Sequence, residues 1–219
     1  MKIDDLHDWN LDPKTAVALQ RELAPQLISD APIAIDRLTS VAGVDVSVRR
    51  KRSRAAVVVM SYPELGTMEI ARAERETSFP YIPGLLAFRE GPAILDALRQ
   101  LRCQPDAFIF DGMGQIHPRK LGIAAHLGLW LQRPTVGCGK THFLGDFVEP
   151  AAEKGSSSAL IYREEVIGEV LRTRAKVKPV YVSVGHLADL ASAVKLILSA
   201  TTRFRLPEPV RAAHHAARL

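Results

Sequence analysis

The first 80 positions of the chain change from a helical to an extended pattern of hydrophobic residues. Residues 13–27 begin with proline and carry apolar side chains at helical spacing, which predicts an amphipathic helix. Three valine-rich or alternating segments follow, and we interpret them as strands at 41–48, 55–62 and 67–77. Because short turns separate them, with the cationic run 49–54 as the first turn, they are expected to form an antiparallel meander.

The pattern changes period after this meander. Residues 84–101 predict a helix that Pro92 either starts or kinks close to Glu90. Apolar runs and helical stretches then alternate, which implies parallel strands joined by crossover helices. The expected elements are a strand at 105–110, a helix at 121–131, a strand at 134–139, strands within 159–184, helices at 187–200 and 207–219, and a flexible loop at 153–159.

These elements predict an α/β protein with one mixed sheet. A three-stranded antiparallel meander is extended by parallel crossover strands and flanked by helices. The length of 219 residues and the hydrophobic content of 47% fit a single domain over residues 1–219 with a large core. In such sheets the chemistry usually gathers at the carboxyl ends of the strands.

The composition narrows the class of function. A net charge of +5 favours a polyanionic partner such as nucleic acid, although a basic surface kept for solubility gives the same charge. Cys103 and Cys138 form neither a CxxC pair nor a disulfide framework, which indicates a reducing compartment. The N-terminus lacks an apolar signal segment, and no apolar run is long enough to span a bilayer. We therefore expect a cytoplasmic protein with no membrane partner.

Two aspartates stand where the predicted strands should be apolar. Asp45 lies inside the first strand, and Asp111 directly follows the apolar run 105–110. A buried carboxylate requires a cation, a metal or several hydrogen-bond donors, so each could be an ordinary salt-bridged residue. If the two strands are neighbours, both acids point into one place, and two hard oxygen ligands favour Mg²⁺ or Mn²⁺. Zinc is disfavoured because no cysteine–histidine cluster has the required spacing.

Three further polar residues are candidates with open alternatives. Glu90 is either a third active-site acid or a solvated surface acid. His117 is either a packed histidine or a ligand. Lys140 follows the strand at 134–139 and could stabilise an attacking or leaving oxygen.

The segment that follows Asp111 is rich in glycine and cations. Gly112 and Gly114 permit close backbone approach to a planar group or a phosphate. Arg119 and Lys120 either contact phosphates or form a solvated turn. The same choice applies to the cationic run 49–54, which is either a solvated hairpin or a contact with a DNA backbone.

Six segments taken together carry a family resemblance. They are GVDVSV (43–48), FPYIPGLLAFREGP (79–92), DGMGQIHPRKLGIAAHLGL (111–129), VGCGK (136–140), VSVGH (182–186) and LPEPVRAAH (206–214). The second and third are long and specific, whereas GVDVSV alone would be weak. Together they closely resemble the endonuclease V family of deoxyinosine-directed repair nucleases, from the N-terminal HDWNLDP to the last residues.

The resemblance implies a fold and an activity. The family has a ribonuclease H-like fold, which agrees with the meander and crossovers. It cleaves DNA in a Mg²⁺-dependent reaction, typically at the second phosphodiester 3′ to deoxyinosine or another deaminated base, leaving a 3′-hydroxyl and a 5′-phosphate. We expect Mn²⁺ to substitute for Mg²⁺, DNA to be the partner, and the protein to be a monomer.

The resemblance also assigns residues by matching position. Asp45 and Asp111 match the metal-binding aspartates, and Glu90 matches the active-site glutamate. Lys140 matches the catalytic-site lysine, and His214 matches a position near the metal. For DNA or lesion binding, the strand-separating wedge is matched by Tyr81, Ile82 and Pro83, and the pocket for flipped hypoxanthine by Gly84, Leu85, Gly112 and Ile123. His117 is expected to fix the loop or a phosphate.

The sequence departs from the family pattern in several places. Val48 stands where an aromatic residue is common, Cys138 and Gly139 stand where Val-Ala is usual, and no arginine follows His186. The chain also ends five residues after His214, so the anchoring of the terminal helix is an open question. None of these departures removes a presumed metal ligand.

Two other classes of function remain open. The first is a ribonuclease H-like nuclease acting on branched DNA or on inosine-containing RNA, although the PYIP segment favours lesion recognition over junction resolution. The second is a catalytically silent nucleic-acid binder. Such a binder would be expected to lose its acids, and Asp45, Glu90 and Asp111 are all present.

Overall fold

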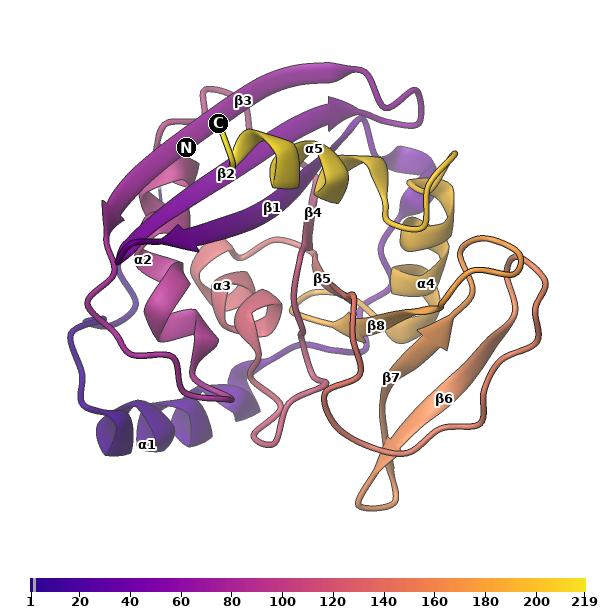
Figure 1. Cartoon of the computed structure of the whole chain (residues 1–219), viewed down its shortest axis with the longest axis horizontal. Helices are drawn as coiled ribbons and strands as arrows, with labels where there is room; N and C mark the ends of the chain where they lie inside the picture. Colours follow the sequence, from indigo (N-terminus) through magenta and orange to yellow (C-terminus); the bar gives the residue numbers. More distant parts are fainter. Residues whose placement is uncertain (2) are drawn as a thin grey trace.

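One eight-stranded mixed sheet organises the computed structural model, which describes residue 1 and residues 3–219 (Figure 1). The strand order is β3-β2-β1-β4-β5-β8-β7-β6. The strands are β1 (Ser40–Arg49), β2 (Arg52–Ser61), β3 (Thr67–Glu76), β4 (Ala107–Phe110), β5 (Thr135–Gly139), β6 (Ser157–Tyr162), β7 (Glu165–Leu171) and β8 (Val180–Val184). The helices are α1 (Pro13–Leu23), α2 (Leu86–Arg99), α3 (Ile123–Leu131), α4 (Leu190–Ser199) and α5 (Glu208–Ala216), with short 3₁₀ turns η1 (Ala24–Gln26) and η2 (Ile35–Arg37).

The sheet combines antiparallel and parallel pairing. Strands β1, β2 and β3 form the predicted antiparallel meander. Strands β4 and β5 add to β1 in parallel, as the alternation of strands and helices predicts. Strand β8 then pairs antiparallel to β5, and β7 and β6 continue as a second antiparallel set. The predicted fold class, a mixed sheet flanked by helices, is confirmed.

Helices cover both faces of the sheet. In Figure 1, α5 crosses in front of β1 and β2, whereas α2 lies behind them. One core packs α2 and α3 against the sheet, and a second packs α4 and the start of α5 against the opposite face. Strand β4 supplies Phe108 and Phe110 to the first core and Ile109 to the second, so its apolar run is continuous because both faces are buried. Burial of each such side chain stabilises the fold by about 1.5–3 kcal/mol.

Several predicted boundaries were wrong, and three of them have a clear structural cause. The first helix ends at Leu23 and tightens to a 3₁₀ turn, because Pro25 has no N–H and restricts the residue before it. The cationic turn is only Arg50–Lys51, since β1 runs to Arg49 and β2 starts at Arg52. The loop expected at 153–159 is in part strand, because β6 starts at Ser157 and pairs with β7.

Two further features bear on the predictions. Pro92 lies inside α2 instead of starting it. Among the described residues, no helix combines the length and apolar character that crossing a membrane would require.

Candidate active site

The parallel pairing of β1 and β4 brings two aspartates together. Val44 on β1 is in register with Phe110 on β4, so Asp45 and Asp111 are the next residues along two neighbouring strands. The Asp111 amide donates a hydrogen bond of 2.9 Å to the Val44 carbonyl, which holds the two backbones in this register just beyond the end of β4. The expectation that both acids point into one place is met.

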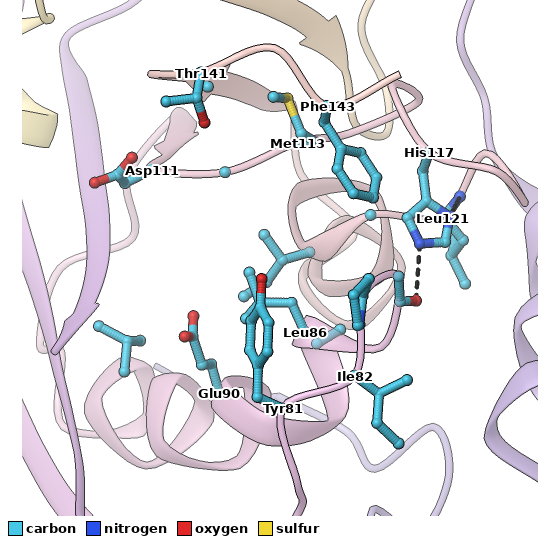
Figure 2. Close-up of a pocket in the computed structure, with 18 of the residues that line it drawn as sticks. Tyr81, Ile82, Leu86, Glu90, Asp111, Met113, His117, Leu121, Thr141 and Phe143 are labelled. Carbon is cyan, nitrogen blue, oxygen red and sulfur yellow. Dashed lines mark hydrogen bonds between the residues drawn. The ribbon is translucent and has the colours of Figure 1, made fainter. Parts of the chain in front are cut away.

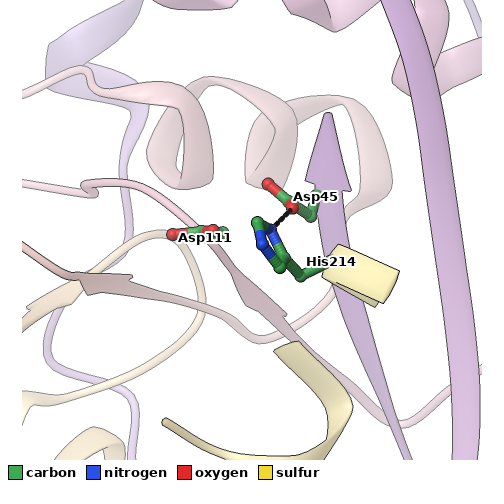
Figure 3. Close-up of side chains that lie close together, drawn as sticks. All are labelled: Asp45, Asp111 and His214. Atoms are coloured by element: carbon green, nitrogen blue, oxygen red, sulfur yellow. Dashed lines mark hydrogen bonds and ion pairs between the residues drawn. The ribbon is translucent and has the colours of Figure 1, made fainter. Parts of the chain in front are cut away.

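Helix α5 adds an imidazole to the two acids. The side chain of His214 points to β1, where its Nδ1 lies 2.7 Å from Asp45 Oδ2 (Figure 3). The helix approaches this closely because Gly43 has no side chain: a Cβ there would stand 2.0 Å from the Pro209 carbonyl oxygen. One potential ligand atom from each of Asp45, Asp111 and His214 lies within 4.8 Å of the other two.

A third acid and a lysine complete this end of the site. Glu90 lies on α2 and Lys140 directly follows β5, and both line the same cavity as Asp45 and Asp111. Lys140 Nζ forms an ion pair with Asp111 Oδ2. The Lys140 carbonyl accepts a hydrogen bond of 2.6 Å from Arg205 Nη2, which steadies the backbone that carries the lysine.

Two of the acids at this end have raised pKa values. Burial, then the charge of Asp45 and also that of Asp111, raises the pKa of Glu90 to about 8 against the lowering effect of Arg89. Burial, then Asp45, raises the pKa of Asp111 to about 6, although Lys140 opposes this. Desolvation and mutual repulsion of the carboxylates thus outweigh the cations beside them, Arg89 for Glu90 and Lys140 for Asp111.

These residues fit a bound divalent cation. Two carboxylates and one imidazole are a donor set suited to a divalent metal, and the carboxylates in particular suit hard ions. Burial is the main cause of both raised pKa values, and such an ion would offset the repulsion between the carboxylates that adds to it. Asp45, Asp111 and His214 would hold the ion, and Glu90 and Lys140 would lie beside it.

A cavity of about 420 Å³ extends from the acids into the protein. Glu90 on α2 and Asp111 just beyond β4 both line it, and both lie on the left side of the view in Figure 2. The volume is in the range of small-molecule sites. The lining residues are Gln20, Asp45, Val46, Tyr81, Ile82, Pro83, Gly84, Leu86, Ala87, Glu90, Asp111, Gly112, Met113, His117, Leu121, Gly122, Ile123, Gly139, Lys140, Thr141 and Phe143.

The Gly84 carbonyl organises the end of the cavity away from the acids. It accepts hydrogen bonds from Gln20 Nε2 (3.0 Å), His117 Nε2 (2.8 Å) and Arg119 Nη2 (2.8 Å). Gly84 has a φ of +80°, and a Cβ there would lie 2.8 Å from Arg119 Nη2. Glycine is therefore required both by the left-handed backbone and by the donors crowded around it.

His117 is a structural residue of this wall. Its Nδ1 accepts hydrogen bonds from the amides of Arg119 (3.1 Å) and Leu121 (3.3 Å), so Nε2 carries the proton that is donated to Gly84. Burial lowers the pKa of His117 to about 4, and the ring is neutral at physiological pH. Of the two expectations, packed residue or ligand, the contacts favour the packed residue.

The two cations after His117 have partners inside the protein. Arg119 donates from Nε to Gln20 Oε1 at 2.6 Å and from Nη2 to Gly84. Lys120 forms an ion pair with Glu165. Arg119 is held in the wall of the cavity, whereas Lys120 and Glu165 pair at the surface. The expected phosphate contacts of Arg119 and Lys120 stay predictions.

Tyr81 stands at the rim of the cavity. Its side chain is 71% exposed while it also lines the cavity, so the alternative that it packs beneath its turn is wrong. Ile82, Pro83, Gly112 and Ile123 line the cavity as expected.

Leu85 is the one assigned lesion-binding residue that the cavity does not include. Its side chain is 2% exposed and packs with Phe79 and Phe88, and its amide donates to the Ile82 carbonyl at 2.9 Å. Leu85 shapes the turn under the cavity instead of lining it.

Sequence reasoning missed several lining residues. Phe143 and Met113 had no recognisable signal, because each is an ordinary apolar residue in a loop. Gln20 did have one: it is a polar residue on the buried side of the amphipathic helix α1, only 1% exposed.

Comparisons with known proteins give consistent matches. The family model described as Endonuclease V matches residues 21–215. Endonuclease V of Trichormus variabilis is 48% identical over 219 residues, covering 97% of this chain and 97% of that protein. The crystal structure of endonuclease V from Bacillus subtilis has a TM-score of 0.96 at 32% identity, covering 100% of this chain and 96% of that one. Endonuclease V of Ciona intestinalis, in complex with a 24mer DNA containing an inosine followed by a ribo-adenosine, has a TM-score of 0.81 at 26% identity, covering 94% and 95% of the two chains.

The fold and the site define a metal-dependent nuclease of the ribonuclease H-like class, a hydrolase that acts on DNA. Within this class, the family model covers most of the chain and a relative is 48% identical over nearly its whole length. The chain belongs to the endonuclease V family. The predicted resemblance and the predicted class of enzyme are confirmed.

Proposed function

We propose that this chain is a Mg²⁺-dependent repair endonuclease that recognises deoxyinosine in DNA. It cleaves the second phosphodiester bond 3′ to the lesion and leaves a 3′-hydroxyl and a 5′-phosphate. The observation that carries the proposal is one continuous cavity with a metal-binding group at one end and a rigid, hydrogen-bonded wall at the other. The DNA complex of the Ciona intestinalis relative, which contains an inosine, supports the lesion. The enzyme acts as a monomeric single domain in the cytoplasm.

Asp45, Asp111 and His214 hold the ion in this proposal. Mg²⁺ is the expected ion because two of the three donors are carboxylates, and Mn²⁺ substitutes for it because it also accepts imidazole. When bound, the ion offsets negative charge on the phosphate under attack and makes water a better nucleophile.

Glu90 and Lys140 act beside the ion. Glu90 lines the cavity next to the acids. With a cation present to favour its ionised form, its carboxylate would orient the attacking water and accept its proton. Lys140 pairs with Asp111 before substrate binds and is close enough to the group to offset charge on a phosphate oxygen.

The flipped base binds at the wall around Gly84, at the end of the cavity away from the acids. Gly84, Gly112 and Ile123 offer backbone and a flat apolar surface to the flipped hypoxanthine, and the bonds to the Gly84 carbonyl keep this wall in place. Tyr81 at the rim fills the gap that the base leaves in the stack. Ile82 and Pro83 line the same rim.

Inosine-containing RNA is the second candidate substrate. The DNA bound by the Ciona intestinalis relative carries a ribo-adenosine after the inosine, so that relative accepts a ribonucleotide there. Branched DNA has no comparable support. A silent binder is disfavoured because the acids are present and assembled.

One experiment tests the proposal. Labelled duplexes with inosine, uracil, an abasic site or a mismatch are incubated with the protein, with and without Mg²⁺, beside inosine-containing RNA. We expect Mg²⁺-dependent cleavage of the inosine duplex at the second bond 3′ to the lesion. Preferential cleavage of the RNA would make inosine-containing RNA the substrate. Absence of any cleavage would refute both candidate substrates.

A further inference from the structure

The turn between β1 and β2 carries three cations without a partner. Arg49, Arg50 and Lys51 are exposed, and within the described part of the chain none of their side chains forms an ion pair or hydrogen bond. Neighbouring cations differ: Arg52 and Arg54 both pair with Glu74. Positive charge is therefore concentrated, unneutralised, at the tip of this hairpin, which lies at the left of Figure 1 beside the end of β3.

The backbone of the turn does not favour these residues. Arg50 and Lys51 have φ values of +47° and +61°, as in the two-residue hairpins that prefer asparagine and glycine. The turn between β6 and β7 has the same left-handed pair, at Arg163 and Glu164, but its two charges are opposite. Turn geometry therefore does not explain a doubly cationic tip, and an external anion does.

The tip is anchored to the segment that carries Tyr81. The Thr77 amide donates to the Lys51 carbonyl at 2.8 Å, and the Ser53 and Thr77 hydroxyls lie 2.7 Å apart. Tyr81 follows Thr77 by four residues, which span at most about 14 Å. The tip is thus tied close to the rim of the cavity.

We infer that Arg49, Arg50 and Lys51 bind the phosphate backbone of duplex DNA beside the lesion. At 3.4 Å per base step, and allowing for the reach of the side chains, the contacted phosphates lie about four to six base pairs from the flipped nucleotide, on one side of it only. These contacts add affinity for any sequence and orient the duplex so that Tyr81 meets the lesion. The inference rests on the proposed function only in taking duplex DNA as the substrate.

The test compares two double variants that lose the same charge. Arg50→Asn with Lys51→Gly removes two cations and supplies the residues that this turn prefers, so its melting temperature should equal or exceed that of wild type. Arg37→Gln with Lys195→Gln is the control. Arg37 precedes β1 and lies about 33 Å from the tip by the length of that strand, and Lys195 is on α4, which contacts the 3₁₀ turn that contains Arg37.

The first readout is the salt dependence of binding to an inosine-free duplex. Loss of two phosphate contacts should reduce the slope of log affinity against log salt by about 1.8 and weaken binding about tenfold, while the control keeps the wild-type slope. Equal slopes for the two double variants, or a wild type that binds no duplex, would overturn the inference.

The second readout locates the contact. An inosine duplex is shortened stepwise from either end, and affinity is measured with Ca²⁺ in place of Mg²⁺. Wild type and control should lose affinity when the duplex on one particular side of the inosine is shorter than about four to six base pairs. The variant Arg50→Asn with Lys51→Gly should show no such drop in affinity. The same drop in affinity in the variant Arg50→Asn with Lys51→Gly would refute the proposed phosphate contact. Cleavage of inosine DNA by the wild-type protein is measured separately and tests the proposed function. Its outcome does not change either of the two binding readouts.

Discussion

The two ends of the active-site cavity satisfy their polar groups in opposite ways. At one end, which we call the metal end, Asp45 is buried, Asp111 and Glu90 are half-buried, and the pKa values of Asp111 and Glu90 are raised. At the other end, where the flipped base is proposed to bind and which we call the base end, the Gly84 carbonyl accepts three hydrogen bonds. Both ring nitrogens of His117 also form hydrogen bonds there. The hydrogen bonds of the base end are made without a ligand, whereas at the metal end Lys140 and His214 do not prevent the raised pKa values of Asp111 and Glu90.

This difference separates two requirements of a lesion-specific nuclease. Recognition needs a wall that does not move when the base arrives, and a closed hydrogen-bond network provides it. Catalysis needs groups that respond to an ion and a phosphate, and leaving charges incompletely balanced costs folding stability until those partners bind. Substitutions at the metal end, at the base end and at the rim of the cavity should therefore have different effects.

The largest effect is expected from removing a metal ligand. Asp111→Ala and Asp45→Ala should each lower cleavage of inosine DNA by about three orders of magnitude or more, because each removes a hard charged ligand. Binding of lesion DNA should survive, since phosphate contacts and the base end remain. Single-turnover cleavage and binding in Ca²⁺ measure the two quantities.

Asp36→Ala, at an exposed acid outside the site, is the matched control. In addition, Mg²⁺ should raise the melting temperature of wild type and of this control but not of Asp111→Ala, because only an intact site links ion binding to folding. An aspartate variant that cuts at close to the wild-type rate would mean that its aspartate is wrongly assigned.

The next effect concerns Glu90 and depends on pH. Its pKa is about 8 when folded, above the ordinary value of 4.5, so without metal the folded protein keeps a proton that the unfolded chain releases. The contribution of Glu90 to the free energy of unfolding should therefore be greatest below pH 4.5. It should fall by up to a few kcal/mol as the pH rises towards 8.

Glu90→Gln removes this titration. In a chelator, thermal unfolding across this pH range should show a flatter profile for the variant, with the greatest gain in stability near pH 8, while its cleavage rate falls strongly. Parallel profiles for variant and wild type would show that Glu90 is not held protonated.

A smaller effect is expected from opening the base end. Gln20→Ala removes one of three donors to the Gly84 carbonyl and leaves Arg119 Nε without its acceptor. We expect a loss of about 1–3 kcal/mol in the free energy of unfolding, with weaker inosine binding and a nearly unchanged rate at saturation. Gln26→Ala, at an exposed position, should change neither. A variant that lost rate but not affinity would contradict the division between the two ends.

The smallest effect is expected at the rim. Tyr81→Ala should leave the melting temperature unchanged because its ring is exposed, and should weaken binding to an inosine duplex about tenfold by removing the wedge. The loss should be smaller with inosine in single-stranded DNA, where no partner strand is separated. Equal losses on both substrates would reduce its role to base stacking.

The fold was predictable from the sequence because its strands carry strong signals. The valine-rich runs gave β1 and β2, and the doubly buried β4 gave a continuous apolar stretch. The turn after β1 was placed too broadly because Arg49 and Arg52 lie on a ribbon that extends beyond the core. An exposed cationic strand and an exposed cationic turn have the same pattern of polarity.

The site was only partly predictable without the family resemblance. Asp45 and Asp111 stood out as acids in apolar strands, and their meeting depended on the pairing of β1 with β4. His214 gave no local signal, because its place is set by the close contact between Gly43 and Pro209 across the sequence. The burial of Leu85 likewise depends in part on a distant segment, because Ala16 of α1 packs in the same cluster as Phe79, Leu85 and Phe88.

The position of His214 on α5 has a consequence for synthesis. Every strand of the sheet and both aspartates precede α5 in the chain, so ribosomes make the sheet before they make the third member of the metal-binding group. Nascent chains therefore carry both acids but cannot assemble the full group until α5 has emerged and docked over β1. If the proposed site requires His214, the order of translation delays its assembly until the chain is nearly finished.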